Sequence, residues 1–240
     1  MKSTLNYIFT TSLTLLLSFN LLSQSYGIGA GINISQLNFN SADNAQFEDY
    51  RSLLGLNMGF YYAFKFSKNM GLRLGLAYSL KGFGYKSEYD SSLDLDNVST
   101  SYVIESETRL SYIQLHPMFK YTLPLGEENT FYAMMGPYIS VGITGALSER
   151  QNYSYIDYID PMNNINIDNS NTEEVQFGQD GGGFDYVNYG FTPVIGLQLH
   201  SFFIEVSYDI GLNDIQTNNE DDFKAYDRTF SIKIGYLFGK

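Results

Sequence analysis

The sequence contains no cysteine and no tryptophan, and only two histidines. Without cysteine the chain can form no disulfide, no thiolate metal site and no cysteine nucleophile. Basic residues are also scarce: 14 lysines and arginines stand against 26 acidic residues, which gives a formal net charge of −12. This charge argues against a nucleic-acid partner, because phosphate binding needs a cationic face.

Beyond its N-terminal segment the chain has no run of 18 apolar residues, so the mature chain is predicted to lack a transmembrane helix. Residues 1–25 have the organisation of a secretory signal peptide: Lys2 supplies positive charge, 5–22 is apolar and hydroxylic, and Ser23 and Ser25 are small. We expect cleavage after Ser25 or, alternatively, after Ser23; an uncleaved anchor is the other interpretation. An exported chain without a helical span can cross a membrane only as a closed barrel.

The rest of the chain has the hydrophobic period of β-strands. Charged residues make up only 17% of the chain and aromatic residues 16%, a composition that favours β structure. In 54–66, seven apolar side chains occupy every second position, and the positions between them include Gly55 and Asn57. This is the spacing of a strand. Eight segments share it: 26–34, 54–66, 72–80, 113–121, 131–143, 187–199, 204–212 and 230–238.

The two faces of these segments differ in chemistry. One face carries Leu, Ile, Phe and Tyr without any charge, and the other carries mainly Gly, Ser, Thr and Asn with a few charged residues. Strands with an apolar lipid-facing side and a polar interior are what a transmembrane barrel requires, since a lysine or arginine facing mid-bilayer lipid costs ~2–4 kcal/mol. The alternative is a secreted β-sandwich whose apolar faces pack together.

The connections between these segments alternate between long and short. They span 38–50, 67–70, 87–108, 122–129, 146–184, 200–201 and 214–227. Outer-membrane barrels have short periplasmic turns and long external loops, and the long connections with their flanks hold all but four of the 26 acidic residues. We therefore predict an all-β fold, an eight-stranded antiparallel up-and-down transmembrane β-barrel over residues 26–240, located in the cell outer membrane.

Several motifs carry a family resemblance. Gly27–Ser35 is similar to the first strand of the PorT-like outer-membrane β-barrel family of Bacteroidota. Tyr112–Tyr121, with its internal Pro117, resembles a central strand of the same family. His116 departs from that pattern, which usually has Ile or Leu. The same family is indicated by the residues Gly136, Pro137, Tyr138, Tyr208, Gly211 and Leu212. The resemblance implies the barrel fold; named members are linked to protein secretion and gliding, and most have no assigned role.

The last strand also resembles the C-terminal signal that the outer-membrane assembly machinery captures by edge pairing. Apolar or aromatic residues occupy every second position: Phe230, Ile232, Ile234, Tyr236 and Phe238. Gly239 and Lys240 follow the final aromatic residue, which departs from the usual signal. We expect deletion of 236–240 to abolish membrane assembly.

The predicted interior holds a set of charged side chains. They are Lys65, Arg73, Lys81, Lys120, Glu205, Asp209 and Lys233. Eight strands close a barrel just wide enough for its own side chains, and charges removed from water must be partnered. We therefore expect a buried ion-pair network that plugs the lumen; a gated ion path is the alternative.

The sequence offers few candidates for catalysis or metal binding. His116 is expected in the lumen and His200 in a turn, and neither accompanies a Gly-x-Ser-x-Gly motif. Acidic and amide residues at 94–97 and 168–171 offer oxygen ligands without EF-hand spacing, and glycines 181–183 precede no helix. We predict no catalytic residue, no cofactor and no metal ligand, with at most weak divalent-cation bridging to lipopolysaccharide.

Together these patterns predict a non-enzymatic outer-membrane protein. Its long acidic loops, above all 146–184, would bind a partner protein or ligand, with a link to secretion or envelope organisation. Expected partners are outer-membrane lipid and lipopolysaccharide, the assembly machinery and an envelope protein. The alternatives are a lipid- or peptide-processing enzyme and a small solute channel. Pro117, Pro137 and Pro193 lie inside predicted strands and require bulges, rim positions or a weakly paired sector.

Overall fold

Nine strands and one short helical turn form the part of the chain that the computed structural model describes, residues 24–40, 50–93, 98–178, 183–216 and 224–239. The elements are β1 (Gln24–Asn40), β2 (Tyr50–Lys65), β3 (Met70–Leu93), β4 (Val98–Pro124), β5 (Asn129–Asp157), η1 (Pro161–Asn163), β6 (Ile165–Val175), β7 (Val187–Leu199), β8 (Phe202–Gly211) and β9 (Lys224–Phe238). Most of the predicted signal peptide, 1–23, lies outside the described residues. Within the described ranges, no helix is long and apolar enough to cross a bilayer.

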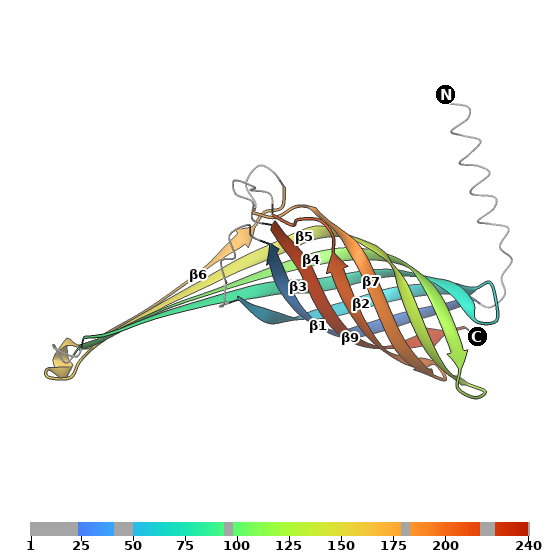
Figure 1. The fold of residues 1–240 in the computed structure, drawn as a ribbon, viewed down its shortest axis with the longest axis horizontal. Helices are drawn as coiled ribbons and strands as arrows, with labels where there is room; N and C mark the ends of the chain where they lie inside the picture. The colour runs from blue at the N-terminus through green and yellow to red at the C-terminus, as the bar shows by residue number, and fades with distance from the viewer. Residues whose placement is uncertain (1–23, 41–49, 94–97, 179–182, 217–223, 240) are drawn as a thin grey trace, which may run out of the picture.

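Eight of the strands close into a ring, as Figure 1 shows. Each pairs antiparallel with its neighbours in the chain; β9 pairs with β1, and β5 pairs with both β4 and β7. β6 lies outside the ring and pairs with β5 alone among the described strands. The prediction of an eight-stranded up-and-down barrel is confirmed, and β6 is an additional ninth strand.

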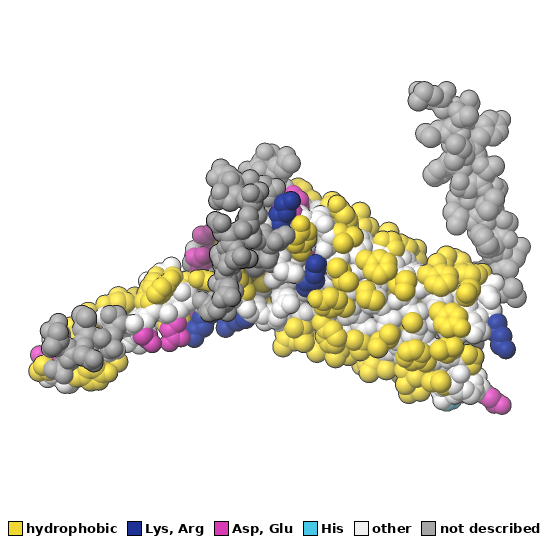
Figure 2. Space-filling model, in the orientation of Figure 1, with side chains coloured by type: hydrophobic (Ala, Val, Ile, Leu, Met, Phe, Trp, Pro, Cys, Tyr) yellow, Lys and Arg dark blue, Asp and Glu magenta, His cyan; other side chains and the backbone are white. Residues whose placement is uncertain are grey.

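The apolar side chains face outward and the polar ones inward. Ile28 and Leu54 are 51% and 65% exposed, whereas Asn57 and Glu205 are 4% and 1% exposed. Figure 2 shows the barrel wall covered by hydrophobic side chains. A water-soluble protein has the opposite arrangement, with apolar side chains inside and polar ones outside, so the alternative of a β-sandwich is wrong.

Two predicted long loops are largely strand. Most of 87–108 belongs to β3 and β4, and most of 146–184 to β5 and β6. These residues are rich in Asn, Asp and Ser, which favour turns in isolation. Their strand conformation comes from pairing with neighbours. The β3–β4 pairing continues without interruption from the barrel wall to Leu93 and Val98, and β6 pairs with the end of β5.

The ends of β3, β4 and β5 extend together past the mouth of the barrel (Figure 1). β2 makes its last pair with β3 at Tyr85. Beyond this point 86–93, 98–105 and 150–157 form a four-stranded sheet with β6, which we call the arm. Eight residues at roughly 3.3 Å each give the arm a reach of ~25 Å.

The strand prolines lie where pairing is interrupted. The ladder between β4 and β5 has no pairs at 116–118 and 136–138, which places Pro117 and Pro137 opposite each other. Because proline has no backbone N–H, each one removes a hydrogen bond from the ladder. When two prolines face each other, the missing hydrogen bonds fall in one gap and the rest of the ladder stays paired. Pro193 lies in a second gap, between β7 and β8.

Candidate functional site

A buried ion pair crosses the lumen between β3 and β8. Glu205 accepts hydrogen bonds from Nη1 and Nη2 of Arg73, the second at 3.1 Å, and from the hydroxyl of Tyr132 at 2.7 Å. The Arg73 guanidinium also lies 4.6 Å from the ring centre of Tyr61. Both charged groups are removed from water and neutralise each other, as buried charges must.

A second ion-pair cluster lies nearer the long-loop end. The Lys81 ammonium is 2.9 Å from Asp209 and 2.6 Å from Asp227. Thr192 donates to Asp209 and Thr229 to Asp227, each at 2.8 Å. Asp227 was absent from the predicted set because it was assigned to the loop 214–227. Its alternation with Thr229 and Ser231 along β9 was the signal that could have placed it inside.

The remaining predicted lumen lysines do not join these clusters. Lys233 is buried opposite Glu205 in the β8–β9 register but forms no ion pair among the described residues. Lys120 lies 3.9 Å from the ring centre of Tyr132. It also lines, with Lys65 and Glu127, a cavity of about 300 Å³ at the short-turn end.

Neither histidine lies in a catalytic arrangement within the described part of the chain. His116 is buried, with its ring 5.8 Å from that of Tyr138. His200 occupies the turn between β7 and β8 at φ 57° and pairs with Glu128. No described serine hydroxyl bonds either ring. The oxygen-ligand candidates at 168–171 lie along β6, and those at 94–97 lie outside the described residues.

Aromatic side chains narrow the long-loop mouth of the barrel. Phe177 and Phe184 are joined by a β-bridge, and the ring of Phe177 meets that of Tyr112 at 5.8 Å. Ile215 is 2% exposed, and its N–H donates to Ala225. Phe177, Phe184 and Ile215 come from predicted loops and were missed because a loop composition does not indicate burial.

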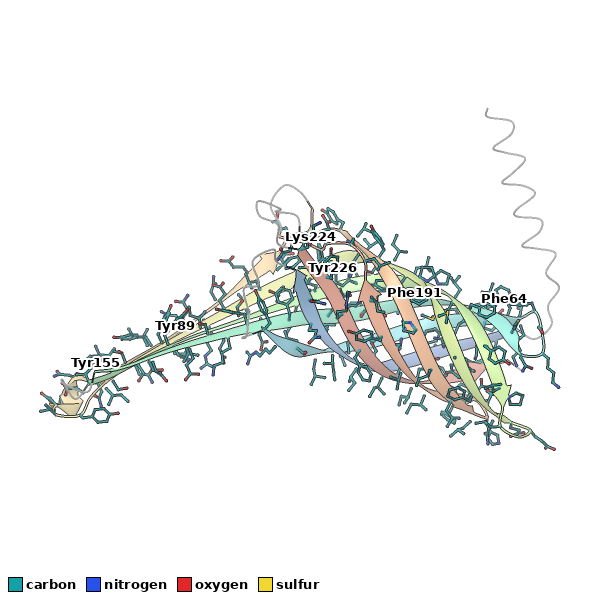
Figure 3. The ribbon with its side chains drawn as sticks, in the orientation of Figure 1. Phe64, Tyr89, Tyr155, Phe191, Lys224 and Tyr226 are labelled. Atoms are coloured by element: carbon teal, nitrogen blue, oxygen red, sulfur yellow. The ribbon has the colours of Figure 1, made fainter. Side chains whose placement is uncertain are left out.

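One face of the arm is rich in tyrosine. Tyr89, Tyr102, Tyr153 and Ile167 stand opposite one another across β3, β4, β5 and β6. Directly opposed residues share a face, as do residues two apart along a strand. The face, which we call the tyrosine face, comprises Tyr89, Tyr102, Ile104, Tyr153, Tyr155, Ile165 and Ile167. Tyr89 is 63% exposed and Ile165 49%, and Figure 3 shows Tyr89 and Tyr155 on the arm.

The opposite face of the arm, which we call the charged face, carries the ion pairs. Arg150 pairs with Asp168 at 2.6 Å, and Arg51 at the base pairs with Glu107 at 3.3 Å. The hydrogen bond from Arg150 lowers the pKa of Asp168. At the β5–β6 connection, backbone N–H groups of Asp160 and Ile159 lower the pKa of Asp157. The tyrosine face has none of these ion pairs, so the arm is amphipathic.

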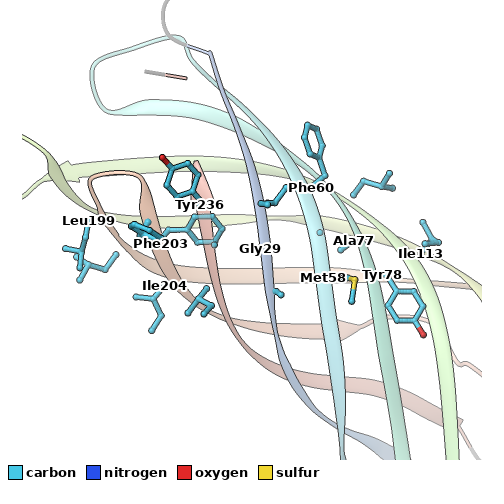
Figure 4. Close-up of a pocket in the computed structure, with 18 residues that line it drawn as sticks. Gly29, Met58, Phe60, Ala77, Tyr78, Ile113, Leu199, Phe203, Ile204 and Tyr236 are labelled. Carbon is cyan, nitrogen blue, oxygen red and sulfur yellow. The ribbon is translucent and has the colours of Figure 1, made fainter. Parts of the chain in front are cut away.

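An apolar hollow lies on the barrel wall near β1, β2 and β9 (Figure 4). Its large side chains, including Met58, Phe60 and Ile204, belong to the outward-facing rows. Small residues such as Gly29 and Ala77 face the lumen behind them. Because the hollow opens on the apolar outer surface, we assign it to contact with lipid.

The predicted assembly row lies on β9. Ile232, Ile234, Tyr236 and Phe238 face outward, with exposed fractions between 36% and 64%. β9 pairs with β1 over 15 residue pairs, so this strand closes the barrel between the two ends of the chain. A strand that closes the ring has to add to a free edge during assembly.

A ring of eight antiparallel strands with an apolar exterior and charged pairs inside defines a transmembrane barrel of the bacterial outer membrane. The model of the outer membrane protein beta-barrel domain family matches residues 22–217, and the chain belongs to this family. The protein is therefore an outer-membrane protein. Barrels of this class have short turns on the periplasmic side and long connections outside the cell.

Three solved structures are similar at low sequence identity. Ail of Yersinia pestis, solved with the heparin analogue sucrose octasulfate, is 14% identical, with 90% of this chain and 100% of that chain covered and a TM-score of 0.36. Neisserial surface protein A is 11% identical, with 89% and 97% covered and a TM-score of 0.33. OprG of Pseudomonas aeruginosa is 9% identical, with 91% and 97% covered and a TM-score of 0.34. A comparison with curated protein sequences finds no match.

Proposed function

We propose that this protein is a non-enzymatic surface protein whose barrel anchors the arm and whose tyrosine face binds an extracellular partner. The observation that carries the proposal is the row Tyr89–Tyr102–Tyr153–Ile167, which lies across four strands without any covering element among the described residues. An antiparallel sheet with one apolar face normally packs that face against something. In a membrane-anchored arm standing in water, the covering surface has to come from another molecule.

The surroundings of this row resemble the anatomy of protein interfaces. Such interfaces have an aromatic centre depleted in charge and a polar rim. Here the tyrosines are flanked by Ser87, Gln151 and Asn169, and the nearest acids on the same face are Glu149 and Asp157. Tyr, Ser and Asn together supply rigid contact area with adaptable hydrogen bonding.

The test uses two adjacent positions that face opposite ways. A photoreactive amino acid is placed at Tyr153 on the tyrosine face or, as a matched control, at Ser154 on the charged face. Illumination of intact cells is expected to give a discrete cross-linked species from position 153 and none from position 154. No cross-link from position 153, or equal cross-linking from both, would contradict the proposal.

We also propose that the barrel conducts no solute. The Arg73–Glu205 and Lys81–Asp209–Asp227 clusters span the lumen, and the aromatic residues around Phe177 occupy the outer mouth. Purified protein in planar bilayers is expected to give no single-channel steps. Steps that change selectivity in a Glu205→Gln variant would instead support the channel alternative.

The finer assignment to the PorT-like group, with its link to secretion or envelope organisation, is likewise our proposal. It is supported by the motifs Gly27–Ser35, which lies in β1, and Tyr112–Tyr121, which lies in the barrel part of β4. Co-purification of secretion components with the wild-type protein, and their loss in a variant without 88–103 and 151–168, would support it. Normal secretion in cells that lack the protein would oppose it.

A further inference from the structure

The outer edge of β6 is an unpaired strand edge on the arm. β6 pairs with β5 through 11 consecutive residue pairs without a register shift, and no described residue pairs with its other side. Ten of its 11 residues are exposed. Its outward N–H and C=O groups therefore face solvent as a row.

Natural proteins usually protect such edges. Common devices are a very short strand, a bulge, a proline or a lysine on the edge. The other free edge of the arm, β3 beyond Tyr85, is shorter and carries Lys86. β6 has the sequence INIDNSNTEEV, with no proline, glycine or lysine. Of the two edges in the described part of the arm, only β6 combines length and regular pairing with the absence of proline, bulge and lysine; its only charged residues are acids.

The side chains of β6 indicate which strand would fit. Ile165 and Ile167 lie on the tyrosine face, and Asp168 and Glu174 lie on the charged face. β6 contains three acids and no cation, and of these only Asp168 takes part in an ion pair. Cross-strand pairs of opposite charge stabilise a sheet, and like charges destabilise it. A second β6 would bring three more acids, so self-pairing is disfavoured.

From this geometry we infer that β6 accepts an extended segment of a partner protein as an added β-strand, with apolar residues toward the tyrosine face and basic residues toward Asp168 and Glu174. The inference rests on the proposed function and names its binding mode. Main-chain hydrogen bonds along the edge would supply affinity, and the alternating side chains would supply specificity. The added strand would also extend the row that ends at Ile167.

The test uses the full-length protein in detergent micelles and a synthetic peptide of eleven residues that alternates valine with lysine. Amide hydrogen exchange is measured across the chain. We expect the peptide to slow exchange in 165–175 and to leave 86–93 on the other edge unchanged. A peptide of the same composition with its lysines clustered at one end, and one with glutamate in place of lysine, are expected to have no effect.

A variant pair separates strand addition from general charge attraction. Ser170→Lys with Thr172→Lys places two lysines on the β6 edge, and neither residue is in an ion pair. Ser99→Lys with Ser101→Lys places two on the same face of the inner strand β4. We expect the first pair to weaken peptide binding by about tenfold or more and the second by less than about twofold. A heat-dependent shift in electrophoretic mobility checks that both variants fold.

Several outcomes would overturn the inference. These are no protection of 165–175, equal protection by the clustered peptide, or equal weakening by both variant pairs. Concentration-dependent protection of β6 without peptide would assign the edge to a second copy of the chain instead. If the peptide fails while cross-linking from Tyr153 persists, strand addition is wrong and the proposed function stands; if both fail, both are wrong.

Discussion

Replacing Glu205 with alanine tests whether the lumen clusters hold the barrel together. The glutamate accepts two hydrogen bonds from Arg73 and one from Tyr132. Both charged side chains are at most 5% exposed. Removal of the carboxylate leaves the guanidinium buried without a counter-charge, on the same side of the lumen as Lys233, which has no ion pair in the described part of the chain.

The expected loss follows from these contacts. Removing one partner of a buried ion pair costs ~3–5 kcal/mol, because the remaining charge stays desolvated. We expect Glu205→Ala to lower the free energy of unfolding by about 4 kcal/mol, nearly a thousandfold in the folding equilibrium. Glu205→Gln keeps the shape and one acceptor, so it should lose less.

The double variant Arg73→Met with Glu205→Leu provides the decisive control. Replacing a whole buried pair by apolar residues is often neutral or stabilising. Because Lys233 would lose the acid that lies opposite it, we expect the double variant to regain only part of the loss seen in Glu205→Ala, at least half of it. Urea unfolding in detergent micelles, followed by the heat-dependent mobility shift, measures all three variants. A loss below ~1 kcal/mol in Glu205→Ala, or a double variant less stable than Glu205→Ala, would refute the reasoning.

Three further predictions concern other parts of the chain. Gly31→Ala should lower the free energy of unfolding in urea by at least ~2 kcal/mol, because its Cβ would lie 2.0 Å from the Ile232 carbonyl oxygen where β1 pairs with β9. The control Gly183→Ala meets no atom within 4 Å and should be neutral. Deletion of 236–240, which removes the β9 residues paired with 26–28, should abolish membrane assembly; normal heat-dependent mobility of the truncated protein in cell envelopes would contradict this. Asp157 and Asp168 have lowered pKa values, so their contribution to stability is present above the usual Asp pKa of about 4 and is lost as pH falls below it. Hydrogen exchange of 150–170, expressed relative to the intrinsic rate at each pH, should lose protection there, and less so in Asp168→Asn.

The barrel was predictable because lipid imposes a strict pattern on each strand. From Leu54 to Phe66 every second residue had to be apolar, and that row is outward-facing in the structure. The lumen partners were only partly predictable. Parity placed Arg73, Lys81, Glu205 and Asp209 inside, but which cation meets which acid depends on side chains reaching across the ring. A strand period contains no information on those distances.

The arm was not predictable from the two-residue hydrophobic period, because neither of its faces contacts lipid and so neither has to be uniformly apolar. Its strands alternate tyrosine and isoleucine with polar residues only in short stretches, and Asn and Ser dominate β6. Such a composition resembles a loop until pairing partners are known. The pairing itself continues from the barrel: beyond one bulge at Ile143, β4 and β5 remain paired to Val98 and Asp157.

A single inserted residue decides which face the β5 tyrosines take. Ser111 pairs with Thr144 and Tyr112 with Gly142, so Ile143 is an unpaired extra residue on β5. Before this bulge the even positions of β5 face the lumen side, and after it the odd positions do. Tyr153 therefore stands opposite Tyr102; with unbroken parity it would lie on the charged face, and the tyrosine row would stop at β4. A one-residue change of register moves every side chain to the other face of a sheet. The proposed binding surface thus depends on a bulge at the outer mouth of the barrel, well away from the tyrosines that would make the contact.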